Sequence, residues 1–304
     1  MSYSIVLSHT THIPRHHHTH HRPDTTTSVM LINGRYKLLK RIGSGAFGLI
    51  FSAKNVNTNE IVAIKLEPTA QMDTLTHEAA VLMKLSGIPG IPSLRYYGVP
   101  DHNRYMVIDL LGKSLQTVSS EYKKSVPFPL VQVYAKQMFQ IIQAVHERGF
   151  IHRDIKPPNF MTGYCENNSS NNESSNTSDK LFIIDFGMSR TYIDDKTKTH
   201  RCNKLRTTGI IGTPRYISTN VHDGNEPSRR DDLISIMYVI IYLVKGRLPW
   251  KAAGSLESVA QMKKTILPEE LFSDMPGSYL DIFNYLCTLS YEEAPNYSYI
   301  IDNL

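Results

Sequence analysis

The sequence predicts an α+β fold in which a smaller, mainly antiparallel β part with one helix precedes a larger, mainly helical part. Short strand-like runs are concentrated between residues 36 and 109, and long runs with helical periodicity follow residue 112. Hydrophobic residues make up 41% of the 304 residues. That fraction is ordinary for a globular protein, so the chain can bury a core, and collagen-like, coiled-coil and wholly disordered chains are excluded.

The first part of the chain consists of short apolar runs that are separated by turn residues. Glycine and asparagine interrupt the pattern between neighbouring runs, which is typical of strands joined by tight connections. Strands so connected pair antiparallel with one another. The predicted strands span residues 36–42, 49–53, 61–66 and 105–109.

One helix is predicted inside this first part. Asp73 can cap it, and the helical pattern continues to about Leu85 before Gly87 ends it. Apolar residues recur there at the spacing of one helix face, and that face should meet the core. The residues expected on it are Leu75, Ala79, Leu82 and Met83.

Helical periodicity dominates the second part. Pro129 opens a segment over residues 131–148 in which apolar side chains recur at helical spacing. The apolar run at residues 233–244 predicts a buried helix, and residues 278–290 predict a further one. A membrane span needs roughly 20 apolar residues, so the apolar run is too short, and no span is expected.

Two segments lack a pattern that could pack into a core. Residues 1–33 form a histidine-rich leader that is expected to be disordered. A histidine tract can also bind Zn²⁺, Ni²⁺ or Cu²⁺, so a metal-binding leader is an alternative hypothesis. Residues 165–179 are rich in Asn and Ser and predict a surface insertion.

Composition narrows the classes of partner and compartment. There are 33 Lys and Arg against 28 Asp and Glu, and the net charge of +5 permits acidic or phosphorylated partners without requiring nucleic acid. The cysteines Cys165, Cys202 and Cys287 suit neither a disulfide framework nor a CxxC zinc site. The sequence shows no secretory signal, so a location in the cytoplasm or nucleus is expected. The protein is also expected to be a monomer.

The glycine-rich segment Gly43-Ser44-Gly45-Ala46-Phe47-Gly48 is the first sign of chemistry. GxGxxG can be a dinucleotide fingerprint, but that motif requires a helix directly afterwards, and here a predicted strand follows. A glycine-rich hairpin lets backbone N–H groups lie close over phosphates because no Cβ intervenes. The segment therefore predicts a phosphate-binding loop between two strands.

A lysine at the end of the next predicted strand is the second sign. Lys65, in Val62-Ala63-Ile64-Lys65, could be a solvated surface charge, but from this strand it can reach polyphosphate oxygens. A carboxylate would have to hold its long side chain in place. Glu78, inside the predicted helix, is the candidate partner.

The most specific motif is His152-Arg153-Asp154-Ile155-Lys156-Pro157-Pro158-Asn159. Asp154 can accept a hydrogen bond from an attacking hydroxyl, and Lys156 can neutralise charge on a transferred phosphoryl group. Asn159 can ligate Mg²⁺, as can Asp185 of the later Asp185-Phe186-Gly187, because Mg²⁺ prefers hard oxygen ligands. If this motif had only a structural role, several charged side chains would be buried at a cost in free energy that no function explains.

Together these motifs resemble those of the eukaryotic protein kinases. Most protein kinases carry Ala-Pro-Glu further along, whereas this chain has Gly212-Thr213-Pro214-Arg215-Tyr216-Ile217-Ser218-Thr219-Asn220. That stretch is similar to the Gly-Thr-Ala-Arg-Tyr-Ala-Ser-Ile-Asn motif of the casein kinase I family. Other stretches similar to that family are Lys65-Leu66-Glu67-Pro68, Leu110-Leu111-Gly112, Ser228-Arg229-Arg230-Asp231-Asp232-Leu233, Leu248-Pro249-Trp250 and Pro295-Asn296-Tyr297-Ser298-Tyr299.

The resemblance covers roughly residues 34–304 and implies a bilobal protein-kinase fold. The N-lobe would span about 34–109 and the C-lobe about 113–304, with ATP and Mg²⁺ bound between them. The implied activity is transfer of the ATP γ-phosphate to Ser or Thr of protein substrates, with a preference for acidic or phospho-primed sites. The alternative is a pseudokinase or scaffold, whose signature would be the loss of Lys65, Asp154 or Asp185.

The resemblance also implies roles for single residues. Thr213 would hydrogen-bond near Asp154 and help to place the substrate hydroxyl, and Arg215, with Lys251 near it, would form a substrate anion site. Taken singly, Arg206, Lys251, Lys263 and Lys264 read as solvated surface charges. The residues implied to contact ATP are Ile42, Gly43, Ser44, Gly45, Ala46, Phe47, Gly48, Leu49, Ile50, Ala63, Lys65, Asp109 and Leu111, with Ile108 at the back of the pocket.

Three positions depart from the family pattern. Pro158 stands where the family usually has Asp, Pro214 replaces an Ala, and Met237 replaces a Gly. Pro158 lies between catalytic positions, so activity is expected to survive although the geometry of the loop could change. Few residues follow the last similar motif, so no autoinhibitory tail is expected.

Overall fold

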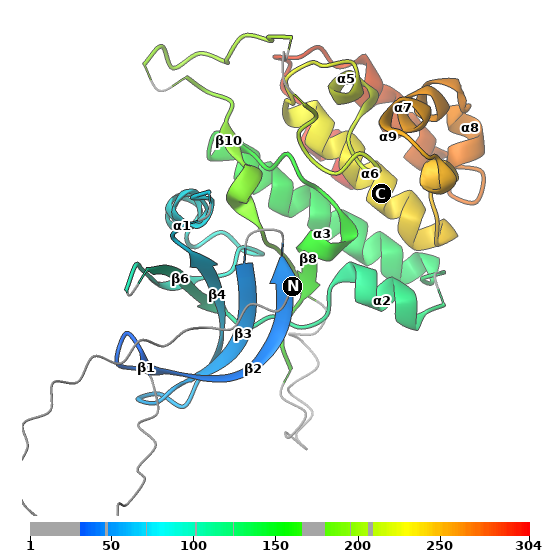
Figure 1. Ribbon diagram of the computed structural model, residues 1–304. Coiled ribbons are helices and arrows are strands. Elements are labelled where there is room, and N and C mark those ends of the chain that lie inside the picture. The colour runs from blue at the N-terminus through cyan, green and yellow to red at the C-terminus, as the bar shows by residue number, and fades with distance from the viewer. Residues whose placement is uncertain are drawn as a thin grey trace, which may run out of the picture.

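The chain forms two lobes in the computed structural model, a β-rich lobe at lower left in Figure 1 and a helical lobe at upper right. The structure describes residues 31–304 apart from 46–47, 71, 101, 124, 166–179, 195 and 206–208. The leader is therefore outside the described residues up to residue 30, and so is nearly all of the 165–179 insertion. Ala46, Phe47 and Arg206 also lie outside them.

The N-lobe is a six-stranded antiparallel sheet with the order β1-β2-β3-β4-β6-β5. Its strands are β1 (Leu31–Ile32), β2 (Tyr36–Gly45), β3 (Gly48–Asn55), β4 (Ile61–Pro68), β5 (Leu94–Gly98) and β6 (Asn103–Asp109). The four predicted strands are all present and form the inner part of this sheet. The sequence did not indicate β1, which is only two residues long, or β5, whose Arg95 pairs with Asp109 and Glu60 rather than packing in the core.

Helix α1 (Leu75–Lys84) packs against this sheet, and one prediction about its core-facing side is wrong. Leu75, Ala79 and Leu82 are buried as expected, but Met83 is 64% exposed. The buried side of α1 also includes Glu78 and Val81, so it is turned away from Met83, which lies at the opposite edge of the predicted stripe. The N-cap residue is Thr74, although the Asp73 carboxylate accepts the backbone N–H of Thr76 at 3.1 Å.

The C-lobe is built around two long helices that pack on each other. Helix α3 (Phe128–Glu147) matches the segment opened by Pro129, and α6 (Arg229–Lys245) contains the apolar run of residues 233–244. Helix α6 begins before its apolar run because Ser228 and Asp231 form a reciprocal capping box. The described part of this lobe also contains α2 (Leu115–Glu121), α5 (Thr219–His222), α7 (Leu256–Thr265), α8 (Pro268–Leu271), α9 (Gly277–Thr288) and α10 (Tyr297–Asp302).

Two short antiparallel pairs place the loops that face the N-lobe. Strand β7 (Phe150–Ile151) pairs with β10 (Arg190–Thr191), and β8 (Phe160–Thr162) pairs with β9 (Leu181–Ile183). The loop after β7 and the loop after β9 are thereby held side by side. These are the loops that carry the two polar motifs found in the sequence.

The observed architecture confirms the predicted α+β, bilobal fold. Over the part of the chain that the structure describes, no helix combines the length and the apolar character that crossing a bilayer requires. Several short C-lobe helices were not predicted, because each has too few turns for a helical pattern to be recognised.

Candidate active site

A deep cleft of about 1080 Å³ lies between the lobes and is lined by residues from both. The glycine-rich hairpin, strands β4 and β6 and helix α1 contribute from the N-lobe, and the two polar loops contribute from the C-lobe. The predicted site residues that line it are Ile42, Gly43, Ser44, Ile50, Ala63, Lys65, Glu78, Asp109, Leu111, Asp154, Lys156, Asn159, Asp185 and Thr213. Gly45, Gly48 and Leu49 lie on the same hairpin without lining the cleft.

The walls of the cleft are apolar on both sides. The sheet register sets Ala63 opposite Ile108, and Ile50 opposite Lys65, so apolar and charged side chains of the N-lobe meet the same space. Met106 and Met161 also line the cleft, and the sequence interpretation missed both. Met161 lies in strand β8, two residues after Asn159, and no pattern in the sequence indicated that it lines the cleft.

The glycine at position 48 is required by a close approach between strands β3 and β4. A Cβ atom on Gly48 would lie 2.0 Å from the carbonyl oxygen of Leu66. Because a Cβ atom cannot lie so close to an oxygen, β3 can approach β4 in this way only with glycine at position 48.

Lys65, Glu78 and Asp185 meet inside the cleft from three different elements. The Lys65 Nζ atom is 2.7 Å from Glu78 Oε2 and 3.3 Å from Asp185 Oδ1. Burial alone would lower the pKa of Lys65, but the two carboxylates raise it above its usual value. Burial likewise would raise the pKa of Asp185, but Lys65 outweighs it and the pKa is lowered. Lys65 is therefore a fixed cation.

The backbone at Asp185 adopts a left-handed conformation, with φ of 70°. This region is strained for a residue other than glycine, and such strain persists only where the surroundings impose it. The following Phe186 is fully buried and packs edge-on against His152, with ring centroids 4.9 Å apart. His152 in turn bonds the carbonyl oxygen of Ile184 at 3.1 Å. These contacts aim the Asp185 carboxylate into the cleft.

Asp154 lies at the centre of a dense hydrogen-bond network and is 5% exposed. Its Oδ2 accepts from Lys156 Nζ at 2.5 Å, and its Oδ1 accepts from the Thr213 hydroxyl at 2.7 Å. The side-chain amide of Asn159 donates to the Asp154 carbonyl oxygen at 2.9 Å. Three polar side chains from two separate stretches of the chain therefore hold Asp154, two through its carboxylate and one through its carbonyl oxygen.

The loop that carries Asp154 is anchored from below by Asp232 of helix α6. Its carboxylate accepts the backbone N–H of His152 at 2.7 Å and that of Arg153 at 2.9 Å. It also bonds the His146 ring at 3.0 Å. Burial would raise the pKa of Asp232, but the hydrogen bond with His146 and its neighbours lower it, so Asp232 is an anion. The sequence did not indicate this role for Asp232, which was noted only as one residue of the stretch 228–233.

Asn159 and Asp185 fit the site of a divalent cation. The Asn159 amide nitrogen donates to Asp154, which leaves the amide oxygen as the end available to a cation. Asp185 holds its carboxylate at the edge of the same cleft, with 31% of the side chain exposed. An amide and a carboxylate oxygen are the hard donors that Mg²⁺ prefers.

The predicted anion-site residues lie outside the cleft. Arg215 and Lys251 are both exposed, and neither lines the cleft. They are neighbours through Trp250, which precedes Lys251 and donates its indole N–H to the Arg215 carbonyl oxygen at 2.8 Å. The backbone of Arg215 is thus joined to the residue that precedes Lys251, while the two charged side chains share no hydrogen bond in the described part of the chain.

The expectation for Lys263 is wrong. The residue is buried, with 7% exposure, whereas its sequence context suggested a solvated charge. Burial lowers the pKa of Lys263 to about 6, while ring faces and carbonyl oxygens around it favour the charged form. The apolar surroundings come from distant elements, so no pattern near residue 263 could have indicated them.

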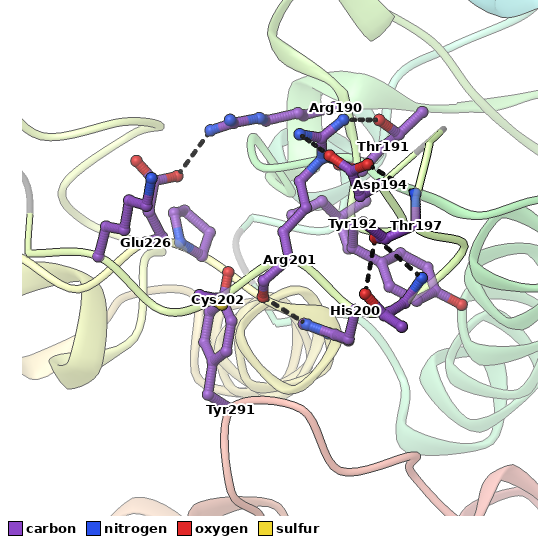
Figure 2. A pocket seen from close by; sticks show the side chains of 14 residues that line it. Arg190, Thr191, Tyr192, Asp194, Thr197, His200, Arg201, Cys202, Glu226 and Tyr291 are labelled. Carbon is purple, nitrogen blue, oxygen red and sulfur yellow. Dashed lines mark hydrogen bonds and ion pairs between the residues drawn. The ribbon is translucent and has the colours of Figure 1, made fainter.

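A second cavity, of about 360 Å³, lies beyond strand β10. Figure 2 shows that its two arginines are engaged by neighbours: Arg190 pairs with Glu226 at 3.2 Å, and Arg201 bonds Thr191 and Asp194. These pairs offset the positive charge of the two arginines. It is separate from the cleft between the lobes, and the two share no lining residue.

Comparisons with known proteins place this geometry in context. The family model described as "Protein kinase domain" matches residues 36–293. Casein kinase I homolog 3 of Schizosaccharomyces pombe is 38% identical over 284 residues, which cover 91% of this chain and 62% of that protein. The chain thus spans about three fifths of the length of that curated relative.

Proposed function

Because the chain belongs to the eukaryotic protein kinases, in the casein kinase I branch, we propose that it is an ATP-dependent serine/threonine protein kinase. The observation that carries this proposal is the convergence of Lys65, Asp154, Asn159 and Asp185 on one cleft. In a phosphoryl transfer the protein contributes mainly positioning and electrostatic stabilisation. These four side chains supply the groups that such a reaction needs.

Asp154 is the group that orients the substrate hydroxyl. Its carboxylate is held on one oxygen by Thr213 and on the other by Lys156, so its direction is set before a substrate arrives. It accepts the proton of the attacking Ser or Thr hydroxyl as that oxygen bonds to the γ-phosphorus, while the bond from this phosphorus to the β–γ bridging oxygen breaks and ADP leaves. Lys156 lies beside it and offsets negative charge on the transferred group.

The other half of the cleft holds the nucleotide. The apolar walls at Ile50, Ala63 and Ile108 accept the adenine ring, and the segment from Asp109 to Leu111 offers backbone groups for its edge. Lys65, fixed by Glu78, pairs with phosphate oxygens. Bound by Asn159 and Asp185, Mg²⁺ would neutralise phosphate charge. The backbone N–H groups of the glycine-rich hairpin would bond the phosphates.

The preference of this kinase is for acidic or phospho-primed substrates. Arg215 is exposed two residues after Thr213, and Lys251 is exposed nearby, so both face a peptide whose hydroxyl reaches Asp154. An arginine side chain grips phosphate or carboxylate groups through two parallel hydrogen bonds. The position of these cations next to the hydroxyl-binding residue supports recognition of an anion near the acceptor.

The pseudokinase alternative finds no support. It would require the loss of Lys65, Asp154 or Asp185, and all three line the cleft with mutually consistent hydrogen bonds. A scaffold has no need for a lysine held between two carboxylates in a nucleotide-sized cleft.

Transfer of labelled phosphate from ATP to serine peptides tests the proposal. We expect the full chain to phosphorylate an acidic or phosphoserine-primed peptide faster than an unprimed neutral one. The Asp154→Asn variant should lose about 10²–10⁴-fold in kcat while binding a nonhydrolysable ATP analogue as the unchanged protein does. No transfer above the background of this variant would refute the enzymatic function.

A further inference from the structure

Lys263 lies in helix α7, directly beneath the segment that connects Thr213 to helix α5. Its Nζ atom is 2.9 Å from the carbonyl oxygen of Pro214 and 2.6 Å from that of Ile217. It is also 3.3 Å from Nε2 of His222 in α5. A single buried amine thus reaches three polar groups on the segment and on the helix that follows it.

Two aromatic rings close the other side of this amine. The Nζ atom lies 4.8 Å from the ring centre of Tyr238 and 5.1 Å from that of Trp250. Ring faces attract a cation and exclude water, which strengthens the hydrogen bonds beside them. Trp250 also contacts the segment directly, because its indole N–H donates a hydrogen bond of 2.8 Å to the Arg215 carbonyl oxygen.

Lys263 and Trp250 therefore hold three carbonyl oxygens of residues 214–217 from below. With these carbonyl oxygens turned inward, the side chain of Arg215 faces solvent and is exposed. The same segment begins at Thr213, whose hydroxyl bonds Asp154. Any shift of the segment would move both the hydroxyl-orienting contact and the exposed arginine.

We propose that Lys263 is a positioning residue for peptide binding, which fixes the docking segment Thr213–Ile217 through its carbonyl oxygens. The inference rests on the proposed kinase function and extends it to the surface that receives an anionic peptide. Lys263 touches neither the nucleotide cleft nor the outer face of the segment, so it acts through Pro214 and Ile217. Its loss should weaken the binding of peptide and leave the binding of nucleotide intact.

The substitution Lys263→Met removes the amine that donates to these carbonyl oxygens while keeping a chain that can fill most of the space. The adjacent Lys264 provides a matched control, because it is partly exposed and pairs with Asp223 at the surface. The probe is a fluorescein-labelled acidic peptide with phosphoserine on the N-terminal side of a serine. Its Kd is measured by anisotropy with a nonhydrolysable ATP analogue present.

For Lys263→Met we expect the peptide Kd and the peptide KM to rise about tenfold, which corresponds to roughly 1.4 kcal/mol. The Kd of the ATP analogue and the KM for ATP should stay within twofold. Lys264→Met should leave every one of these constants within twofold. An unchanged peptide Kd in folded Lys263→Met, or an equal rise in both variants, would overturn the proposal.

Trp250 is the single tryptophan of the chain, so tryptophan fluorescence reports on the surroundings of Lys263 without any substitution. We expect saturating peptide to change the Trp250 emission of the unmodified protein, because the indole is bonded to the docking segment. Should Lys263→Met fail to fold, saturation without any change in emission would still contradict the proposal. Peptide binding needs no phosphoryl transfer, so an inactive protein whose peptide Kd still depends on Lys263 would refute only the kinase function.

Discussion

The hydroxyl of Thr213 donates a hydrogen bond of 2.7 Å to the carboxylate of Asp154, although 59 residues separate the two in the chain. The other carboxylate oxygen accepts from Lys156. With both oxygens engaged, the carboxylate cannot rotate freely, and the direction in which it can accept a further hydrogen bond is set. A residue outside the catalytic loop thus shares in orienting its central group.

Removing this hydroxyl should slow the reaction without disturbing nucleotide binding. A hydrogen bond to a charged group is worth about 1.5–3 kcal/mol, so Thr213→Val is expected to lower kcat by roughly 10–100-fold. Steady-state kinetics with a serine peptide measure this, and KM for ATP should hold within twofold. Thr288→Val, on helix α9, is the control and should behave like the unmodified protein. A Thr213→Val enzyme with full kcat would show that the contact is not used.

The buried pair of Glu78 and Lys65 should be sensitive to the loss of one partner. Breaking such a pair costs about 3–5 kcal/mol, and the lower end is expected for Glu78→Gln because Asp185 still faces the ammonium group. Urea unfolding measures the loss, and KM for ATP should rise since Lys65 is less firmly held. Glu121→Gln removes an exposed partner of Lys113 and should cost less than about 1 kcal/mol. Equal losses for the two variants would argue against the buried pair.

Gly212 should not tolerate a side chain. Its φ is +92°, and a Cβ atom would lie 2.5 Å from the Arg153 carbonyl oxygen in the catalytic loop. Gly212→Ala is expected to lower the free energy of unfolding by about 1–3 kcal/mol and to impair phosphoryl transfer, because the loop must move away. Gly254→Ala meets no atom within 4 Å and serves as the control in thermal unfolding. Full activity in Gly212→Ala would show that the loop can yield without harm.

The stability of the C-lobe should depend on pH through His222. Burial, followed by the nearby Lys263, lowers the pKa of His222 to about 4 from 6.5. Between these values the unfolded chain binds a proton and the folded chain does not, so stability is lost as the pH falls from 6.5 towards 4. Urea unfolding at pH 7 and pH 5 should therefore show a smaller loss for His222→Gln than for the unmodified protein. Identical losses would mean that His222 titrates normally in the folded state.

Much of the catalytic site could be predicted because its residues stand in short motifs. Asp154, Lys156 and Asn159 lie within one loop, and their spacing follows from local backbone geometry. The strands of the N-lobe were likewise visible, since alternation and glycine-rich turns are local features. Lys65 and Glu78 could be paired in advance because one strand and the next helix are close neighbours in sequence.

Other features depended on elements that are far apart in the chain. Met83 faces solvent because of the way α1 lies on the sheet, and a few degrees of helix rotation decide such a position. Asp232 supports the catalytic loop only because helix α6 passes beneath it. In neither case do the neighbouring residues in the sequence indicate the environment of the side chain.

The amino-acid sequence alone determined the two-part α+β architecture, the phosphate-binding hairpin and the polar motifs, because periodicity and motif spacing act over a few residues. Only the tertiary structure decided the surroundings of Lys263, which Tyr238, Trp250, His222 and two carbonyl oxygens supply from three other segments. Whether a lysine is solvated or buried depends on which surfaces pack over it. That packing is settled by the whole chain at once.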